Sequence, residues 1–526
     1  MKERDELMMR LLKRAGMLAL ALVLLICFAS CKNEDKPAPE TKGEEISLTN
    51  ENGEVLYEVV RPDTCSEDVK NAAILLKKQL EAITGKDVGI ETDFMERGIA
   101  ESEYAAKYEI LVGDTCRSES REAMAGLQEN QFVIRHSGNK IVIAGKDDMS
   151  TVYAVDRFLS AFSKNEDGTF QTASKIPEAA FREGSYSPLD GPIFGKYYVR
   201  NLEGYYKTQG RTFATENGLE LLYTCCSFEF NAKCQGKVSV TMYSENTGSG
   251  DWAVFFTGYV DGERCETRFA VDGNGETELV LAENLPEGDH TFALVRQTEW
   301  DRGDTYVKAI ALDGVLTEKP KDQELYIEFI GDSLTSAFGN LSDIQAEGWG
   351  GMPLLQDGTQ SFGYLTAQAL HADCSIVAIQ GIGVVCGPQE IVMGDVYPKF
   401  PFVSDPDFTY SFDRKADIVV INMGTNDYET MAAKGHTTAE VMDAMKALAL
   451  TVREKNPGCK TVFVTGMQPS FTRELKKLAK DLGGEAEGYY YLKLKQEMTG
   501  HEGHTSVKGH EENAEILTEF LRKLIG

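Results

Sequence analysis

LYIEFIGDSLTSAFGN, residues Leu325–Asn340, is the stretch that decides the fold of the C-terminal part of the chain. Its first half, Leu325–Ile330, is short and apolar and follows the polar segment KPKDQE, which predicts a buried strand. The strand breaks at Gly331, Ser333 follows in the turn, and a helix is expected to begin within Ser336–Phe338. A strand, a tight turn and a helix place the Ser333 hydroxyl at the carboxyl edge of a sheet, where α/β folds bind ligands. Ser333 is therefore a candidate nucleophile, provided that a base can reach it.

The rest of residues 322–526 continues to alternate predicted strands with predicted helices. Apolar, β-branched runs predict further strands, and apolar side chains on one helical face predict helices. The strands are expected at Ser375–Ile379, Ile418–Met423, Thr461–Thr465 and Tyr489–Leu492, and the helices at Phe362–His371, Ala439–Lys455 and Glu511–Leu524. Because such alternation is typical of parallel sheets, we expect an α/β domain with helices on both faces of its sheet.

Residues with the chemistry of ester hydrolysis follow the ends of these strands or precede the last helix. Ser333 follows the first strand, Gly381 the second and Asn426 the third, while His504 precedes the final helix. A serine hydroxyl needs a base to take its proton, and the oxyanion that then develops needs hydrogen-bond donors aimed at it. The order predicts a hydrolytic site at the carboxyl edge of the sheet, with Gly383 as the alternative to Gly381 if the loop is shifted.

The motifs GDSL and GTND, and a terminal GH before a helix, resemble the SGNH or GDSL hydrolase superfamily over the whole of residues 322–526. The resemblance implies that Ser333 is the nucleophile and that His504 is the general base. It also implies an oxyanion hole formed by the backbone N–H groups of Ser333 and Gly381 and by the side chain of Asn426. No cofactor is implied.

The position three residues before His504 holds His501, where many members of the superfamily have Asp. Within the superfamily, the stretches GDSLTSAFGN, SFGYLTAQAL, INMGTND, VTGM and GHTSVKGH are similar to carbohydrate esterase family 2 (CE2). In that family an acidic residue two positions before the histidine can orient it, and some members use a Ser-His dyad. The resemblance therefore implies that Glu502 is the orienting acid; the alternative is a solvated loop carboxylate.

The same family resemblance implies a substrate class. CE2 enzymes remove acetyl groups from plant polysaccharides such as xylan and glucomannan. Trp349 and Tyr428 lie in loops near the expected site and could stack on a sugar ring, although lid packing is the alternative for Trp349. The function expected is that of a serine esterase that removes O-acetyl groups from carbohydrate.

Residues 188–316 have a different pattern, with short runs of two-residue periodicity and frequent Gly, Asp and Asn breaks. Without a convincing helix, this pattern indicates a β-sandwich of jelly-roll type. The strands are expected at Cys226–Phe230, Lys237–Met242, Trp252–Tyr259, Thr277–Leu281, Thr291–Val295 and Val307–Leu312, with a turn at Gly288–His290. CE2 enzymes place a β-sandwich directly before the hydrolase domain, which agrees with this order.

Residues 46–180 predict a small two-layer α/β domain. Strand, helix, strand, hairpin and helix follow one another, with Ser66 as the N-cap of the first helix. The stretches LEAITGKDV, EILVGDT and FVIRHSGNKIVIAGKDDMSTVYAVDRFL resemble the non-catalytic N-terminal domain of glycoside hydrolases of the α-glucuronidase and hexosaminidase kind.

Residues 1–30 combine basic residues with a short apolar run, Met17–Phe28, which indicates a cleaved secretory signal and not a membrane span. The run ends in Phe28-Ala29-Ser30-Cys31, which resembles the lipobox of bacterial lipoproteins and implies a lipid on Cys31; an ordinary signal peptide is the alternative. Residues 31–45 then form a polar tether. The expected location is the bacterial cell envelope, on either face of the outer membrane.

The charge of the chain limits its partners. The sequence has 54 Lys and Arg against 83 Asp and Glu, a formal net charge of −29, and removal of residues 1–30 would make it −31. Such an acidic surface disfavours nucleic acids and anionic polymers and favours neutral substrates. The histidines show no spacing typical of metal ligands, so no metal site is expected. Two functions remain as alternatives to a carbohydrate deacetylase: an esterase or lipase acting on other acyl or aryl esters, and a non-catalytic glycan-binding lipoprotein.

Overall fold

The computed structural model describes residues 46–95, 101–165, 167–187, 191–215, 217–342, 353–399 and 409–526. The predicted signal peptide, the lipidation residue Cys31 and the predicted sugar-stacking residue Trp349 lie outside these ranges. The chain divides into two compact units, Met1–Phe194 and Gly195–Gly526. Each unit is described by itself.

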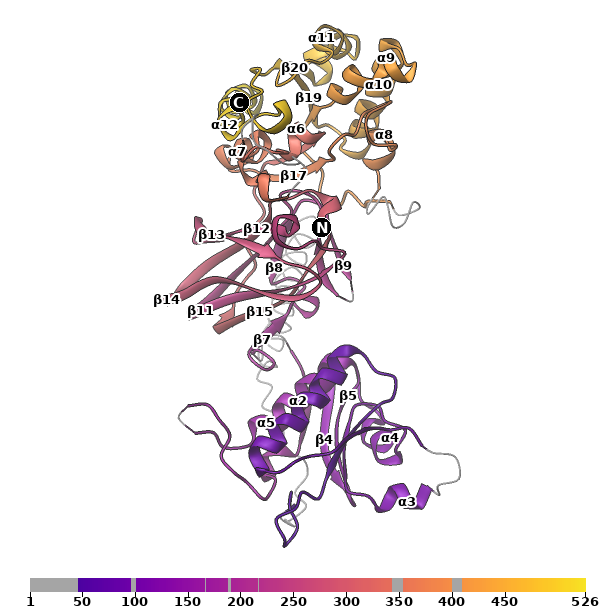
Figure 1. Cartoon of the computed structure of the whole chain (residues 1–526), viewed down its shortest axis with the longest axis vertical. Coiled ribbons are helices and arrows are strands. Elements are labelled where there is room, and N and C mark those ends of the chain that lie inside the picture. Colours follow the sequence, from indigo (N-terminus) through magenta and orange to yellow (C-terminus); the bar gives the residue numbers. More distant parts are fainter. Residues whose placement is uncertain are drawn as a thin grey trace, which may run out of the picture. The chain divides into compact units, whose positions relative to one another are not determined.

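The first unit contains a six-stranded sheet with the order β2-β1-β3-β5-β4-β6, in which β4 runs antiparallel to its neighbours β5 and β6. Ser66 caps α2 by accepting a hydrogen bond from the Val69 N–H, as its position predicts. Helices α2 and α5 pack on one another and on the sheet (Figure 1). The elements are β1 Glu58–Arg61, α2 Glu67–Thr84, β2 Ile90–Thr92, α3 Glu101–Ala106, β3 Glu109–Val112, α4 Ser118–Met124, β4 Gln131–Ser137, β5 Lys140–Gly145, α5 Asp148–Ser160 and β6 Arg182–Ser185.

The second unit begins with an antiparallel β region, here called the β-domain (residues 196–316). Its nine strands are hydrogen-bonded in the order β13-β12-β14-β11-β15-β10-β9, with β7 on β15 and β8 on β11. The strands are β7 Lys196–Tyr198, β8 Tyr206–Gln209, β9 Thr212–Thr215, β10 Gly218–Leu221, β11 Ser227–Glu245, β12 Val254–Val260, β13 Glu263–Val271, β14 Gly275–Arg296 and β15 Asp304–Leu316.

Two pairs of strands expected in this domain are single long strands. β11 covers both of the first two expected strands, and β14 covers Thr277–Leu281 together with Thr291–Val295. The expected turn at Gly288–His290 is therefore wrong, because Gly288 pairs with Cys234 inside the ladder. Pairing of β11 with β14 shifts register three times between Cys234 and Ser239. β-Bulges in this part of the ladder allow the strands to continue through residues that the sequence pattern presents as breaks, such as Gly288.

The C-terminal part of the second unit (residues 322–526), here called the catalytic domain after the hydrolytic site expected in it, has the predicted parallel sheet. Five parallel strands have the order β17-β16-β18-β19-β20. The elements are β16 Tyr326–Gly331, α6 Ser333–Ser336, α7 Phe362–Ala369, β17 Asp373–Ala378, α8 Met393–Val396, β18 Ile418–Asn422, α9 Thr425–Lys434, α10 Thr438–Lys455, β19 Lys460–Thr465, α11 Thr472–Asp481, β20 Tyr489–Lys493 and α12 Val507–Ile525. Buried residues of α7 and α12 join one apolar cluster and those of α10 and α11 join another, so both faces of the sheet are covered.

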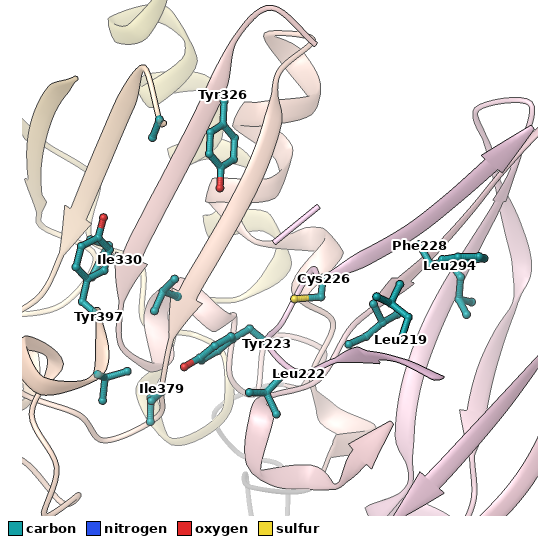
Figure 2. Packing of buried hydrophobic residues seen from close by; sticks show 14 of the residues in the cluster. Leu219, Leu222, Tyr223, Cys226, Phe228, Leu294, Tyr326, Ile330, Ile379 and Tyr397 are labelled. Atoms are coloured by element: carbon teal, nitrogen blue, oxygen red, sulfur yellow. The ribbon is translucent and has the colours of Figure 1, made fainter. Parts of the chain in front are cut away.

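One large apolar cluster contains side chains of both the β-domain and the catalytic domain. Figure 2 shows that side chains from the two domains meet here, with Tyr223 of the β-domain near Ile379 of the catalytic domain. The labelled members are Leu219, Leu222, Tyr223, Cys226, Phe228 and Leu294 from the β-domain, and Tyr326, Ile330, Ile379 and Tyr397 from the catalytic domain. Removal of this shared apolar surface from water stabilises the two domains as one unit.

A buried arginine adds a polar contact across the same boundary. Arg211 of the β-domain is fully buried, and its guanidinium lies 4.4 Å from the ring centroid of Tyr410 and 3.3 Å from the Glu328 carboxylate. It also donates a 2.6 Å hydrogen bond to the Tyr397 carbonyl. A buried charge with this many partners is tolerated, but removal of any one partner is costly.

Candidate active site

Ser333 lies directly after β16, at the carboxyl edge of the parallel sheet. The turn is tight because a Cβ atom at Gly331 would lie 1.9 Å from Thr335 Oγ1, so this position requires glycine. Asp332 caps the following helix by accepting a hydrogen bond from the Leu334 N–H. Helix α6 begins at Ser333 itself and ends before Ala337, which has a φ of +63°. The expected helix start within Ser336–Phe338 is therefore wrong, since the chain leaves the helical conformation there.

The structure brings His504 to Ser333. His504 Nε2 lies 2.9 Å from Ser333 Oγ, although 171 residues separate them in the chain. The ring of Phe338 packs against the imidazole, with 4.7 Å between ring centroids. Burial lowers the pKa of His504 below its ordinary value of 6.5, and this outweighs the opposite effect of its hydrogen bond to the backbone at His501. The imidazole is therefore neutral at neutral pH and can accept the serine proton.

The second imidazole nitrogen of His504 is held by the backbone. His504 Nδ1 lies 3.1 Å from the carbonyl oxygen of His501, the residue three positions earlier. The Glu502 side chain is 53% exposed, and its carboxylate lies 3.9 Å from His501 Nε2. Among the described residues, the hydrogen-bond acceptor at Nδ1 is thus a carbonyl oxygen, whereas the sequence predicts the Glu502 carboxylate there.

The loop that bears His501 and His504 is braced by polar side chains. Gln468 Nε2 donates a 2.6 Å hydrogen bond to the Gly503 carbonyl. The Glu497 carboxylate accepts a 2.8 Å hydrogen bond from the Ser506 N–H, and Thr505 Oγ1 donates to the Glu497 carbonyl at 3.0 Å. These contacts fix a backbone on which the orientation of the imidazole depends.

Of the expected oxyanion donors, Gly381 lies in a loop and Asn426 in a helix, both at the carboxyl edge of the sheet. Gly381 follows β17 with a φ of +76°, a conformation that favours glycine. Asn426 stands in the first turn of α9, directly after β18. Its Nδ2 donates to the Ile382 carbonyl at 2.9 Å and lies 3.5 Å from Asp332 Oδ2. The Asn426 amide thus lies between the residue after Gly381 and the residue before Ser333.

The Asp427 side chain holds the loop that follows Gly381. Its fully buried carboxylate accepts hydrogen bonds from three successive backbone N–H groups, those of Val384, Val385 and Cys386, at 2.8–3.0 Å. One buried side chain thereby holds three successive backbone N–H groups of the loop. Asp427 directly follows Asn426 in the GTND motif, but nothing in the sequence indicates that it organises the loop.

Of the two residues expected to contact sugar, the structure describes Tyr428. This side chain is 47% exposed on α9, two residues after Asn426, and packs edge-on against Phe471 with 5.4 Å between ring centroids. One edge of the ring is thus supported by protein while nearly half of the side chain is accessible. Its role in binding remains a prediction.

Neither a metal cluster nor a membrane span occurs in the part of the chain that the structure describes. Within those ranges, no group of three or more His, Cys, Asp or Glu side chains is arranged to hold a metal ion. The helices described there are all too short or too polar to cross a lipid bilayer.

Comparison with known families assigns both halves of the second unit. Residues 208–320 match the family "Carbohydrate esterase 2 N-terminal", and residues 327–517 match "GDSL-like Lipase/Acylhydrolase". The chain contains a CE2 N-terminal domain and a GDSL domain. The CE2 N-terminal domain corresponds to the β-domain, and the GDSL domain to the catalytic domain.

Two curated relatives are similar to these domains. The "Cellulase/esterase CelE" of Acetivibrio thermocellus is 28% identical over 334 residues, which is 60% of this chain and 39% of that protein. The "Acetylxylan esterase / glucomannan deacetylase" of Cellvibrio japonicus is 31% identical over 163 residues, which is 28% of this chain and 42% of that protein. The chain therefore spans about two fifths of the length of each relative.

Solved structures share the fold of the two domains together. A family two carbohydrate esterase from Clostridium thermocellum in complex with cellohexaose is 25% identical, with a TM-score of 0.55, and the match covers 61% of this chain and 99% of that one. The acetyl xylan esterase Est2A from Butyrivibrio proteoclasticus is 20% identical, with a TM-score of 0.56, and the match covers 63% and 98%. CE2 esterases are thus homologues of this chain.

Proposed function

We propose that this protein is a serine esterase that removes O-acetyl groups from carbohydrate. The observation that supports the proposal most directly is the 2.9 Å contact between Ser333 Oγ and His504 Nε2 at the carboxyl edge of the GDSL domain. The homology to CE2 esterases supports the substrate class.

In the first half of the reaction, neutral His504 takes the proton of Ser333 as the oxygen attacks the acetyl carbonyl carbon. Negative charge develops on the carbonyl oxygen, where the backbone N–H groups of Ser333 and Gly381 and the side chain of Asn426 are proposed to donate. Protonated His504 then gives its proton to the departing sugar hydroxyl, which leaves an acetyl-serine. In the second half, His504 activates water, and the same donors stabilise the second tetrahedral intermediate.

The His501 carbonyl is proposed to perform the orienting task in this mechanism. It holds the Nδ1–H of His504, so that Nε2 faces Ser333. By accepting the Nδ1–H, a carbonyl oxygen stabilises the tautomer in which Nε2 is free to accept the serine proton, although it carries no full negative charge. The arrangement favours a Ser-His dyad with a backbone acceptor over a triad that includes Glu502.

Burial of the nucleophile supports a small acyl group. Ser333 is only 7% exposed, so the carbonyl carbon must enter a confined place to reach its oxygen. We expect rapid hydrolysis of 4-nitrophenyl acetate and slow hydrolysis of the octanoate, followed by release of acetate from acetylated xylan or glucomannan. Ser333→Ala should abolish all of these activities. Preference for octanoate would favour the lipase alternative, and persistence of activity in Ser333→Ala would refute the serine mechanism.

The envelope location and the first unit are parts of the same proposal. A lipid on Cys31 would tether the enzyme to a membrane through residues 31–45, and the first unit would be a non-catalytic domain of the α-glucuronidase and hexosaminidase kind. Labelling of cells with an alkyne fatty acid should mark the wild-type protein and leave Cys31→Ser unmarked. Equal labelling of the two would refute the anchor.

A further inference from the structure

A glutamate of the β-domain reaches into the candidate active site. Glu299 follows β14, immediately before the short helical turn Trp300–Arg302, and its side chain is completely buried. Its Oε1 accepts a 2.5 Å hydrogen bond from Ser336 Oγ, and its Oε2 accepts a 2.9 Å hydrogen bond from the Gln380 N–H. Both donors belong to the catalytic domain.

Ser336 and Gln380 lie in the two segments that contain Ser333 and Gly381, whose backbone N–H groups are the proposed donors of the oxyanion hole. Ser336 ends the single helical turn that begins with Ser333, and its hydroxyl also lies 3.2 Å from the Ser333 carbonyl. Gln380 directly precedes Gly381. One carboxylate therefore spans the two loops, one oxygen on each.

The segment that bears Glu299 is itself held firmly. Arg296, fully buried at the end of β14, donates to the Glu299 carbonyl at 2.5 Å and to the Thr298 carbonyl at 3.1 Å. Arg302 Nη2 donates to Gln380 Oε1 at 3.0 Å, which gives Gln380 a second contact with the same segment. The β-domain thus holds the backbone of the segment that carries the Glu299 carboxylate.

Arg268 of the β-domain is also linked, through Gln356, to the helical turn Ser333–Ser336. Gln356 Nε2 donates a 2.8 Å hydrogen bond to the Ser336 carbonyl, and the Gln356 carbonyl accepts from Arg268 Nη2 of the β-domain at 2.5 Å. The hydroxyl and the carbonyl of Ser336 are therefore both positioned, directly or through one residue, by the β-domain.

We propose that Glu299 is a positioning residue that fixes the spacing between the Ser333 N–H and the Gly381 N–H, so that the β-domain completes the oxyanion hole. The inference rests on the proposed esterase function. Oxyanion-hole donors act only when they are placed for the transition state, and a misplacement of about 1 Å can cost about 10²-fold in rate. The interaction is with the transition state, so its loss should lower kcat and leave KM nearly unchanged.

The chain offers a matched control, Asp373, at the amino end of β17, the strand that precedes Gln380. Asp373 begins β17, is buried, and bonds to Lys207 of the β-domain at 2.5 Å. Gln380 lies just beyond the opposite end of β17. Both carboxylates join the β-domain to the catalytic domain, but only Glu299 does so beside the oxyanion loops.

A conservative variant tests the geometry separately from the charge. In Glu299→Gln, the amide oxygen can accept from the Gln380 N–H, and the amide nitrogen can donate to Ser336 Oγ, whose hydroxyl can rotate. Both loops would remain joined. Glu299→Ala removes both hydrogen bonds and leaves the Gln380 N–H and the Ser336 hydroxyl without their partner.

The experiment compares the full chain as wild type, Glu299→Ala, Glu299→Gln and Asp373→Ala, with kcat and KM on 4-nitrophenyl acetate and the thermal midpoint of each. We expect Glu299→Ala to lose about 10- to 100-fold in kcat with KM within about 2-fold. Glu299→Gln should retain kcat within about 3-fold, and Asp373→Ala should lower the thermal midpoint while keeping kcat within about 3-fold. If Glu299→Ala does not fold, Ser336→Ala, which removes one of the two bonds, should lower kcat by about 3- to 10-fold.

Three results would overturn the inference while the esterase function stands: unchanged kcat in Glu299→Ala, an equal loss in Asp373→Ala, or a Glu299→Gln variant as slow as Glu299→Ala. A fluorophosphonate, which phosphonylates an activated serine as fluoride leaves, serves as a second probe of the hole if acetate esters are poor substrates. A wild-type protein inert to both reagents, or one whose activity survives Ser333→Ala, would instead refute the proposed function and the inference with it.

Discussion

Removal of the Glu502 carboxylate is expected to leave catalysis nearly intact, although the sequence presents this residue as the third member of a triad. The reason is that the Nδ1 of His504 is held at 3.1 Å by the His501 carbonyl. Where a buried Asp performs this task in serine proteases, its replacement by Asn lowers kcat by about 10⁴-fold. Here the corresponding acceptor belongs to the backbone and survives the substitution.

The magnitude follows from the exposure of the side chain. Glu502 is 53% exposed, so its field at the imidazole is screened by water. Exposed ion pairs contribute about 0.2 to 1 kcal/mol, and about 1.4 kcal/mol corresponds to a tenfold change in rate. We therefore expect Glu502→Ala to change kcat/KM by less than about 5-fold.

The pH dependence gives the same variant a second readout. The Glu502 carboxylate raises the pKa of His504, against the larger lowering by burial. Its removal should lower that pKa further, so the acid limb of the kcat/KM profile should move to lower pH. Because Glu502 has a left-handed backbone with a φ of +51°, Glu502→Gly removes the carboxylate without the strain that Ala retains there.

The assay is hydrolysis of 4-nitrophenyl acetate from pH 5 to 9 by wild type, Glu502→Ala, Glu502→Gly and Gln468→Ala. Gln468 holds the Gly503 carbonyl in the loop that bears His501 and His504. Its removal should therefore slow the enzyme by about 10-fold or more, through misplacement of the base. A loss of more than about 100-fold in both Glu502 variants would refute the backbone-acceptor mechanism and restore the triad.

Four further outcomes follow from the structure. In wild type, kcat/KM should fall as the pH drops through a pKa below 6.5, because buried His504 must lose its proton to act as a base; a limb above 7 would contradict this. Asn426→Ala should lower kcat by about 10²- to 10³-fold in steady-state assays, and a loss under about 3-fold would remove it from the oxyanion hole. Arg211→Ala should lower the free energy of unfolding by about 3 to 5 kcal/mol in urea titrations, since it strands the buried Glu328 carboxylate; a loss below about 1 kcal/mol would refute this. Burial raises the pKa of Glu299 from 4.5 to about 7, so its contribution to stability is complete below pH 4.5 and is lost as the pH rises through 7, and this decline should be smaller in Glu299→Gln than in wild type.

The parts of the site that could be predicted from sequence are those that local chain geometry determines. Ser333, Asn426 and the loop at Gly381 each follow a strand of a parallel sheet, so strand prediction alone brings them to one edge. His504 precedes the last helix, and the structure places it 2.9 Å from Ser333. A short motif and the end of a strand are both local features, so they can be predicted before the fold is known.

The parts that could not be predicted depend on contacts between distant segments or on backbone atoms. Glu299 lies in another domain, 34 residues before Ser333, and nothing in its neighbours marks it as a partner of Gln380. The acceptor at His504 Nδ1 is a carbonyl oxygen, which every residue has, so no residue type could reveal it. The prediction of Glu502 as the orienting acid came from the resemblance to CE2, whereas the contact at His504 Nδ1 is set by the backbone geometry of this loop.

The fold of the β-domain shows a similar limit. Gly288 and its neighbours have the composition of a turn, but the ladder between β11 and β14 continues through them with shifted register. Pairing with a neighbouring strand can outweigh the local preference of such residues for a turn, and here β11 pairs with β14 on both sides of Gly288. The sequence therefore predicts that this domain consists of β-strands, but it does not predict where the strands end.

The apolar cluster shared by the two domains has a consequence for how such enzymes are inherited and engineered. A cut near residue 322 would place Tyr223 and Ile379, or Arg211 and Glu328, on different polypeptides and expose both halves to water. The solved relatives agree, because matches that cover 61–63% of this chain account for 98–99% of theirs. We therefore expect the two domains beyond Gly195 to be transferable between proteins as a pair, and a cut near residue 322 to destabilise both.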